Sequence, residues 1–362
     1  MAAATLRVTR SRHHAGLISG GAGVVVVVIL ACLPFLVNQG LTTILVNFFI
    51  LLALASMWNV LAGYGGLVSV GQQAYIGIGA YTVLVIAQNG INAFIGIPVA
   101  VVVGALLAVP ASWFLFRLSG GYFAIATWVL AVVATIIITG ISALGAGTGK
   151  AVPGLLNYNA TLLGAYTYWA SLAVVVAAII AVYLLLRSRM GLVLTAIRDN
   201  EIAARSIGGK VRRAKLAVYL LSSAGCAAVG AVIAISQFDV QASNVFNIQW
   251  TAYMIFAVLI GGMGTIEGPI IGSAIFIALQ QTLSQFNGWY LVLVGVVAMV
   301  VAIWVRGGLF GFWASRSSFS LFSVGYFLHG GPPPGGEAPS EGGPNGGARR
   351  RWWPRRLRPR PG

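Results

Sequence analysis

The residues best suited to specific chemistry in this chain lie between positions 187 and 215. This segment carries eight of the chain's 22 basic residues and two of its six acids, Asp199 and Glu201, although only 8% of all residues are charged. The basic residues are Arg187, Arg189, Arg198, Arg205, Lys210, Arg212, Arg213 and Lys215. Such clustered charge belongs outside a bilayer, and its basic excess favours the cytoplasmic side. Because the loop is longer than a reversal of the chain requires, we expect it to bind a partner.

Part of this loop has the pattern of an amphipathic helix. Its apolar residues at helical spacing are Leu194, Ile197, Ala204 and Ile207. The charged residues beside that face are Arg198, Glu201 and Arg205. We expect Thr195 or Asp199 to cap this helix and Gly208 to end it. The helix is interpreted as a docking element, and the alternative is a short helix lying on the membrane surface.

The sequence offers no catalytic, metal-binding or cofactor-binding set. All three histidines lie outside the apolar runs, and both cysteines, Cys32 and Cys226, lie inside them. The sequence contains no GxxxxGK[ST] phosphate loop. The stretch 145–150 resembles one only loosely and lacks the required spacing. The predicted spans hold no Asp, Glu, Lys, Arg or His, with Asp239 and Glu267 only at their borders, whereas an ion-coupled carrier normally needs such charges. A secondary carrier and an intramembrane enzyme therefore remain only as alternatives from other classes.

Composition predicts an all-α, polytopic membrane protein. The chain is 59% hydrophobic, and its mean hydropathy is +0.91. That much apolar surface requires lipid as the solvent, and about 20 apolar residues suffice for one span. About ten spans are predicted, at residues 20–37, 41–62, 67–88, 95–116, 122–145, 164–186, 216–238, 248–262, 269–287 and 289–305.

Charge bias predicts the orientation of these spans. With the N-terminus inside, the inner side receives the basic arm of residues 1–19, Arg117 and the whole 187–215 loop. The outer side receives Lys150 as its only basic residue and Asp239 as its only acid. This distribution follows the positive-inside rule and favours an even number of spans.

Glycine-rich segments interrupt two of the predicted spans. The residues that we assign to a solute path are Gly63, Gly65, Gly66, Ser69, Gly71, Gln72, Gln73, Tyr75, Gly77, Gly79, Gly261, Gly262 and Gly264. Two interpretations stay open: close helix packing through small residues, or broken and re-entrant helices that line a path. The adjacent amides of Gln72 and Gln73 favour the second, because unpaired amides in lipid are costly. Replacing Gly71 and Gly77 with leucine is then expected to abolish uptake while the complex still assembles.

The ends of the chain differ from this core. Residues 20–312 are predicted to form the transmembrane domain, and residues 313–362 a disordered tail rich in Pro, Gly and Arg. Seven arginines fall in the last fourteen positions, so the net charge of +16 overstates the charge of the core. We interpret the basic residues as a topology signal and as contacts to membrane lipids, and not as a nucleic-acid site.

Three blocks resemble the permease subunit of bacterial branched-chain amino-acid ABC importers, of the LivM type, over roughly residues 40–312. The first covers residues 63–82, the second 196–208 with Lys215, and the third 261–265 with Gly268 and Pro269. The second block resembles the cytoplasmic loop that couples such permeases to their ATPases. Its residues here are Ile197, Arg198, Asp199, Asn200, Glu201, Ala203, Ala204, Arg205, Ile207 and Gly208. Ile202 is inserted after Glu201 relative to the general ABC pattern, and the chain departs from the family at Gln73 and in the outer loop near residues 147–150.

The resemblance implies partners and a substrate class. A complete importer of this family has two ABC ATPase subunits, a second homologous permease, with a heterodimer expected, and a solute-binding protein. The implied substrates are branched-chain or related hydrophobic amino acids. Urea and short-chain amide importers share the fold and these blocks, so a urea or amide permease is the alternative within transport.

Overall fold

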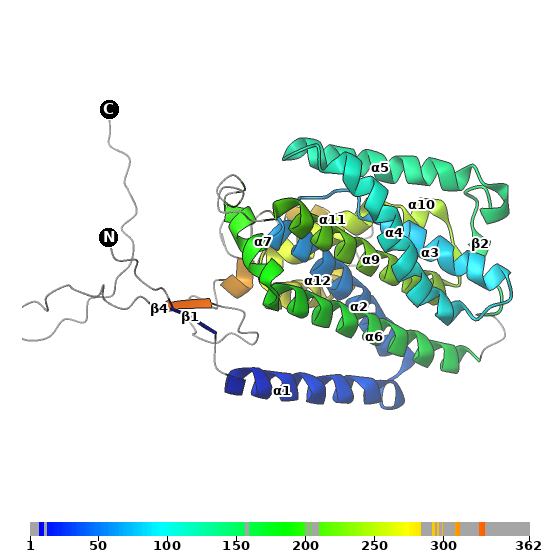
Figure 1. Cartoon of the computed structure of the whole chain (residues 1–362). Coiled ribbons are helices and arrows are strands. Elements are labelled where there is room, and N and C mark those ends of the chain that lie inside the picture. The colour runs from blue at the N-terminus through cyan, green and yellow to red at the C-terminus, as the bar shows by residue number, and fades with distance from the viewer. Residues whose placement is uncertain are drawn as a thin grey trace, which may run out of the picture. The chain divides into compact units, whose positions relative to one another are not determined.

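The computed structural model describes residues 7–10, 13–155, 159–199, 201, 204 and 210–283, together with 292–293, 295–296, 299, 308–311 and 326–329. The all-α class predicted from the sequence is confirmed for this part of the chain (Figure 1). Its helices are α1 (His13–Cys32), α2 (Gln39–Asn59), α3 (Gln73–Gln88), α4 (Gly96–Leu115), α5 (Gly121–Thr139), α6 (Ala160–Arg187), α7 (Arg189–Asp199), α9 (Val211–Gln237), α10 (Ala242–Val245), α11 (Gln249–Gly261) and α12 (Glu267–Leu283).

Six segments of the described residues are long and apolar enough to cross a membrane. They are Gln39–Tyr64, Ala93–Leu115, Gly121–Thr139, Leu162–Arg187, Val211–Gln237 and Ala242–Gly261. The segments Gly23–Phe35 and Gln73–Gln88 are apolar but shorter. The predicted span 67–88 begins too early, because α3 starts only at Gln73 and residues 65–72 are irregular. The predicted span 289–305 lies almost wholly outside the described residues.

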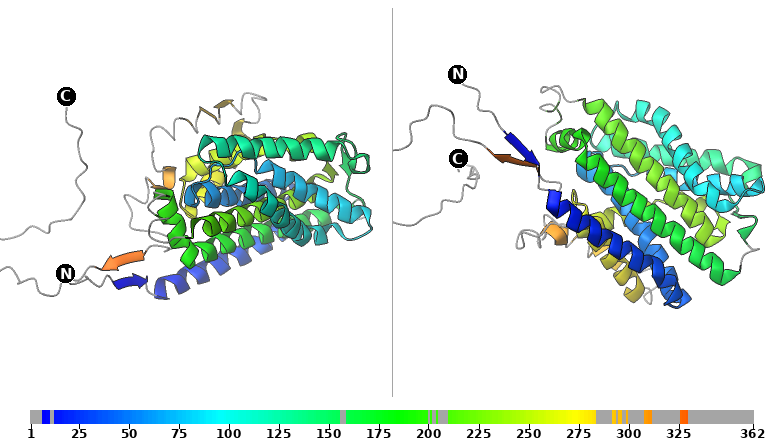
Figure 2. Two further views of the ribbon diagram at one scale, coloured as in Figure 1. Left: turned by 45° about the horizontal axis from the view of Figure 1, so that its top comes forward. Right: turned by 60° about the horizontal axis from the view of Figure 1, so that its bottom comes forward.

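The helices α2 and α9 are the most buried of the described membrane-length helices. In both, 78% of the most apolar 18-residue window is buried, whereas in α5 the corresponding share is only 17%. Close approach of α9 to α3 depends on glycines, since a Cβ on Gly79 would collide with the Ala227 carbonyl and one on Gly230 with the Ile76 carbonyl. Small residues thus allow backbone contact between helices where lipid provides no hydrophobic drive. The long helices accordingly run side by side (Figure 2).

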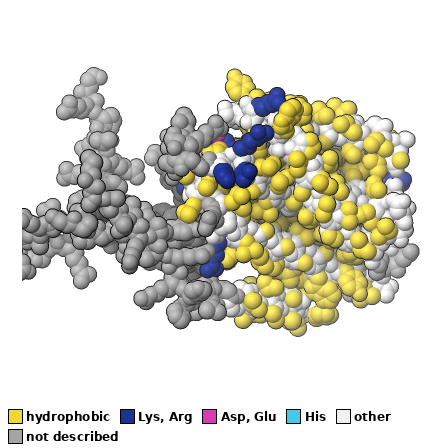
Figure 3. All heavy atoms as spheres, viewed as in Figure 1, with side chains coloured by type: hydrophobic (Ala, Val, Ile, Leu, Met, Phe, Trp, Pro, Cys, Tyr) yellow, Lys and Arg dark blue, Asp and Glu magenta, His cyan; other side chains and the backbone are white. Residues whose placement is uncertain are grey.

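Two groups of loops lie at opposite ends of this helical unit. At one end β2 (Lys150–Ala151) pairs in antiparallel fashion with β3 (Asp239–Val240). The predicted outer residues Lys150 and Asp239 therefore lie together. The helix α7 lies at the other end (Figure 1), where the Lys and Arg side chains gather on the face drawn in Figure 3, separated from the β2 end by a broad hydrophobic surface.

A second unit is formed by residues 1–11 and 325–362. Within it β1 (Arg7–Arg10) pairs in antiparallel fashion with β4 (Tyr326–His329). The strand β4 lies in the segment predicted as a tail. The helix α1 begins at His13, inside the segment predicted as an N-terminal arm.

Candidate functional site

The backbone between α2 and α3 is unwound inside the protein. The helix α2 continues into one π-helical turn, η2 (Val60–Tyr64), whose last bond runs from the Gly65 N–H to the Val60 carbonyl at 3.1 Å. Residues 65–72 then contain no helix or strand. Gly66 has φ +66°, a conformation that favours glycine. A π-turn followed by irregular backbone is typical of functional sites in membrane helices.

Side chains from neighbouring helices satisfy this irregular backbone. The indole Nε1 of Trp58 in α2 donates to the Ser69 carbonyl at 2.9 Å. The Thr127 hydroxyl of α5 accepts from the Val70 N–H at 3.1 Å, and the Ser69 hydroxyl accepts from the Gly71 N–H at 3.3 Å. Because water is absent from a bilayer core, such partners must come from the protein. The segment is therefore held in a defined conformation.

Asn59 joins the first glycine-rich block to the third. Its side chain is 2% exposed. The Oδ1 atom accepts from the Gly264 N–H at 2.8 Å, and Nδ2 donates to the Thr265 carbonyl at 2.7 Å. One carboxamide thus pairs with two backbone groups of the turn between α11 and α12, in which Gly264 has φ +78°.

Arg198, a residue of the second block, contacts the end of α2 next to the turn that Asn59 binds. Its Nη1 donates to the Gly63 carbonyl at 3.4 Å, in the π-turn that ends α2. A Cβ on Gly264 would lie 2.6 Å from that Nη1 atom, so a larger residue there would displace the guanidinium from its present position. Tyr64 lies within electrostatic range of both Arg198 and the buried Glu267. All three blocks identified in the sequence therefore meet in what we call the junction, formed by Asn59, Gly63, Arg198, Gly264 and Thr265.

The described residues of the 187–215 loop agree with the predicted helical face. Leu194, Ile197 and Ala204 are each buried. Glu201 is held by Lys215, whose Nζ lies 2.8 Å from Oε2. The loop therefore turns its apolar side inward and fixes part of its charge internally.

The prediction of Thr195 as a helix cap was wrong, and the alternative cap, Asp199, is the last residue of α7. The helix α7 runs over Arg189–Asp199, so Thr195 lies inside it and donates its hydroxyl to the Leu192 carbonyl at 2.9 Å. Ser188 takes the capping role, because its hydroxyl accepts from the Met190 N–H at 3.1 Å. The other predicted coupling residues, Asn200, Ala203, Arg205, Ile207 and Gly208, lie outside the described residues.

Three of the predicted path residues, Gln72, Gln73 and Tyr75, lie at or just before the start of α3. The Oε1 atom of Gln73 accepts from the Thr251 hydroxyl of α11 at 2.5 Å. The Tyr75 hydroxyl lies 2.8 Å from the Tyr219 hydroxyl of α9. Gln72 is completely buried, and neither its amide nitrogen nor its amide oxygen has a partner among the described residues. An unpaired buried amide is rare enough to require an explanation.

Several glycines predicted to line a path are also points of helix contact. A Cβ on Gly71 would collide with the Thr127 carbonyl, and one on Gly77 with the Phe246 ring. The same holds for Gly63, Gly65, Gly79 and Gly261, where a Cβ would meet other atoms of the chain. Leucines at Gly71 and Gly77 would therefore disturb packing. The expectation that this double variant still assembles does not fit the geometry, and a test of the path needs other residues.

Sequence reasoning missed four polar residues of this region. All four lie within apolar runs: Asn59, Thr127, Thr251 and Tyr219. No sequence pattern near them predicts which residue each one contacts. A lone amide in an apolar run, as at Asn59, is the same signal that drew attention to Gln72. The amide of Asn59 was therefore predictable as a site of polar contact from the sequence.

The described residues contain no group of His, Cys, Asp and Glu side chains able to hold a metal ion. Cys32 is exposed, Cys226 is buried, and both are free thiols. The polar groups of the region are amides, hydroxyls, one guanidinium and the buried carboxylate of Glu267, and such groups suit hydrogen bonding to a solute or to backbone.

The family described as "Branched-chain amino acid transport system / permease component" matches residues 40–305. This range contains the junction and all three blocks. The chain belongs to this permease family. Membership and the apolar helices together make it a multi-pass membrane protein of a transporter family, in agreement with the resemblance seen in the sequence.

Individual relatives of the permease agree with this assignment. The high-affinity branched-chain amino acid transport system permease protein LivM of Escherichia coli (strain K12) is 25% identical over 313 residues, which cover 79% of this chain and 73% of the relative. The protein of the same name from Salmonella typhimurium (strain LT2) is 26% identical over 309 residues, covering 78% and 72%. A probable branched-chain amino acid transport permease protein LivM of Methanocaldococcus jannaschii is 24% identical over 215 residues, covering 58% and 60%.

Among solved structures, the permease is similar to a chain of PsaBC from Streptococcus pneumoniae in complex with Fab. The identity is 15%, the match covers 75% of this chain and 93% of that chain, and the TM-score is 0.37.

The junction makes a prediction about stability. Replacing Asn59 with leucine keeps the side chain's size but leaves the Gly264 N–H and the Thr265 carbonyl without their partner. Each unpaired buried group costs about 1–3 kcal/mol. We expect the Asn59→Leu variant of the full chain, purified in detergent, to melt several degrees below the natural protein, about 2–4 °C for each 1 kcal/mol lost.

The matched control is Asn89→Leu. Asn89 is exposed, and its Nδ2 donates to the Val85 carbonyl of its own helix at 2.8 Å. This variant should melt close to the natural protein. Equal melting temperatures for the Asn59 and Asn89 variants would show that the junction contributes no stability.

Proposed function

We propose that this permease is the membrane subunit of an ABC importer that carries branched-chain or related hydrophobic amino acids across the bacterial cytoplasmic membrane. The observation that carries the proposal is the family match over residues 40–305. The relatives named above are branched-chain amino acid permeases, which supports the same substrate class here. The energy would come from two separate ATPase subunits, since the chain has no phosphate loop. A second homologous permease and a solute-binding protein would complete the assembly.

The 187–215 loop is the proposed contact to the ATPases. Its buried face, with Leu194 and Ile197, anchors α7 to the permease. Basic residues later in the same loop, Lys210, Arg212 and Arg213, are exposed and would meet the partner. Arg198 links this loop to the Gly63 carbonyl. A displacement of the loop by an ATPase would therefore act on the end of α2, where the unwound segment begins. The junction thus supplies a short physical connection between docking and the proposed path.

The proposed path runs beside residues 63–79, with the free amide of Gln72 turned toward the solute. In this proposal Gln72 lacks a partner among the described residues because the solute or its water supplies one. Gln73 is fixed by Thr251 and shapes the path without the same freedom. Broken helices with a Gly-rich backbone are the usual place for such sites in transporters.

We place ten spans in the membrane, with the N-terminus and the 187–215 loop in the cytoplasm. The charge bias of the loops supports this orientation. The pairing of β2 with β3 brings Lys150 and Asp239 to the end opposite α7, as the orientation requires.

The path proposal predicts opposite effects of one substitution on stability and on uptake. Replacing Gln72 with leucine removes a buried amide without a partner, so the melting temperature should stay the same or rise. Uptake of labelled leucine should fall about tenfold or more, the effect of one lost hydrogen bond of roughly 1.4 kcal/mol. The assay is reconstitution in vesicles with the ATPases, ATP and the solute-binding protein, with labelled urea measured in parallel.

Gln88→Leu is the control on the same helix, because Gln88 is exposed at the end of α3. It should leave uptake unchanged. Natural uptake by the Gln72 variant would remove Gln72 from the path. Accumulation of urea in place of leucine would establish the amide alternative, and accumulation on a proton pulse without ATPases would overturn the importer proposal.

The coupling proposal is tested by exchanging the charges of Glu201 and Lys215. Glu201→Lys alone brings two cations together and should uncouple ATP hydrolysis from uptake or release the ATPase. The double exchange Glu201→Lys with Lys215→Glu restores an internal ion pair but still presents reversed charge to the partner. We expect the double variant to recover its melting temperature and not its uptake. Full recovery of uptake would show that Glu201 acts only through Lys215.

The orientation is tested with single cysteines in a chain carrying Cys32→Ser and Cys226→Ser. Lys150 and Lys210 are both exposed and belong to opposite ends of the helical unit. A membrane-impermeant maleimide added to intact cells should label Lys150→Cys at once. Lys210→Cys should react only after the membrane is opened. The reverse pattern would invert the proposed topology.

A further inference from the structure

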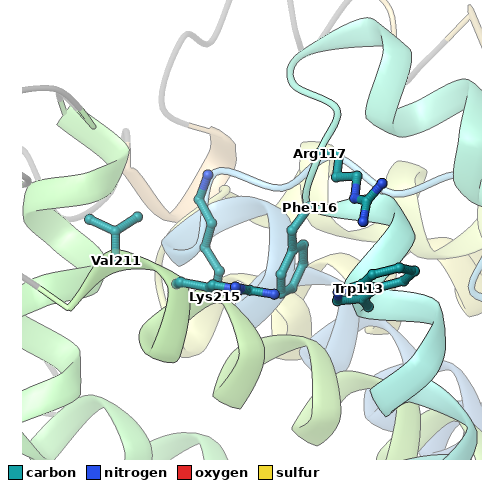
Figure 4. A pocket seen from close by; sticks show the side chains of 6 residues that line it. Trp113, Phe116, Arg117, Val211 and Lys215 are labelled. Carbon is teal, nitrogen blue, oxygen red and sulfur yellow. The ribbon is translucent and has the colours of Figure 1, made fainter.

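A basic pocket lies where α4 ends and α9 begins. Its cavity has a volume of about 310 Å³. It is lined by Trp113, Phe116, Arg117, Val211, Arg212 and Lys215. The aromatic side chains and Arg117 come from the end of α4, and the others from the start of α9 (Figure 4). Three of the lining residues are cations, and none is an acid.

The charges of the pocket are only partly balanced. Lys215 is paired with Glu201 at 2.8 Å. Arg117 lies over the Trp113 ring, with its Cζ 4.1 Å from the ring centroid, a contact that orients the guanidinium without neutralising it. Arg212 is exposed and has no acidic partner among the described residues. Two positive charges thus remain available to an anion.

An apolar stripe leads along α4 to this pocket. The exposed fractions of Val102, Leu106, Val109 and Trp113 are 55%, 63%, 49% and 50%. Their spacing of four, three and four residues puts them on one side of the helix. Ala100, Gly104, Ala108 and Ser112 are buried at a spacing of four, so the side that packs against the protein is a different one. The stripe faces away from the core, within a helix long enough to span the membrane.

We propose that the pocket binds the phosphate of an anionic phospholipid, whose acyl chains lie along the α4 stripe. Guanidinium groups bind phosphate oxygens in a bidentate manner, which suits Arg117 and Arg212. Tryptophan at the end of a spanning helix marks the boundary between headgroups and acyl chains, so Trp113 sets the pocket at headgroup depth. Continuity of the stripe with the pocket favours a lipid over free phosphate, which would use only the basic end.

The test compares phosphatidylglycerol, phosphatidylcholine and inorganic phosphate as probes. Lipid bound to the full-length chain in detergent is measured by native mass spectrometry during titration with each lipid. The natural chain should retain phosphatidylglycerol in preference to phosphatidylcholine. In the Arg117→Ala/Arg212→Ala variant the affinity for phosphatidylglycerol should fall about 10- to 30-fold, as expected for two basic residues near a headgroup.

The control removes two charges from the same loop outside the pocket. Lys210→Ala/Arg213→Ala changes exposed residues that do not line the cavity, and it should retain the preference. Melting temperatures of both double variants establish that the chains are folded. Equal loss in the two variants, or equal binding of both lipids, would overturn the proposal. Displacement of the lipid by millimolar inorganic phosphate would assign the pocket to a free anion instead.

Discussion

The pairing of the Asn59 carboxamide with the turn at Gly264 and Thr265 is the contact on which the rest of this region depends. An unwound backbone within a bilayer must find its partners inside the protein, because lipid offers none. Asn59 lies one residue before the π-turn of α2, and it ties that turn to the start of α12. Trp58 and Thr127 then hold the irregular residues that follow. Without these side chains, residues 65–72 would regain their hydrogen bonds only by becoming helical.

The helices of this chain differ widely in how much of their surface is buried. The helices α2 and α9 are mostly buried, and glycines allow α9 to contact the backbone of α3. The helix α5 is largely uncovered, with Ile125, Val129 and Ile136 more than half exposed. Apolar surface of that extent is stable only against lipid or another protein. The chain therefore combines a rigid centre, which keeps the unwound segment in place, with an outer layer built for apolar surroundings.

The sequence predicted the helical class, and six of the ten predicted spans coincide largely with described segments that are long and apolar enough to cross a membrane. It also singled out three blocks that meet in space, although they are far apart along the chain. The partners of Asn59 could not be predicted, because the bonded residues are 205 and 206 positions away and no local pattern connects them. The start of α3 was misplaced for a related reason. Residues 67–72 are apolar enough for a span, and only tertiary hydrogen bonds from Trp58 and Thr127 make the unwound form favourable.

The glycines of the predicted path serve two different structural roles. Gly71 and Gly77 face a carbonyl and an aromatic ring, so their absence of side chains serves packing. Gly66 and Gly264 have positive φ, so they serve backbone geometry. Neither role excludes a path, but neither requires one. The free amide of Gln72 differs in kind, because packing alone gives no reason to keep an unpaired polar group at complete burial.

Energies at the junction limit how the proposed coupling can work. Reversing a two-state equilibrium from 1:99 to 99:1 requires about 5.5 kcal/mol. One neutral hydrogen bond contributes about 1 kcal/mol, and one with a charged donor about 1.5–3 kcal/mol. The single contact from Arg198 to the Gly63 carbonyl is therefore too weak to switch the permease by itself. The two bonds of Asn59 end in the same turn that contacts Arg198, so all three can change in one movement and together approach the required energy. A coupling mechanism at this place must act on the junction as a unit.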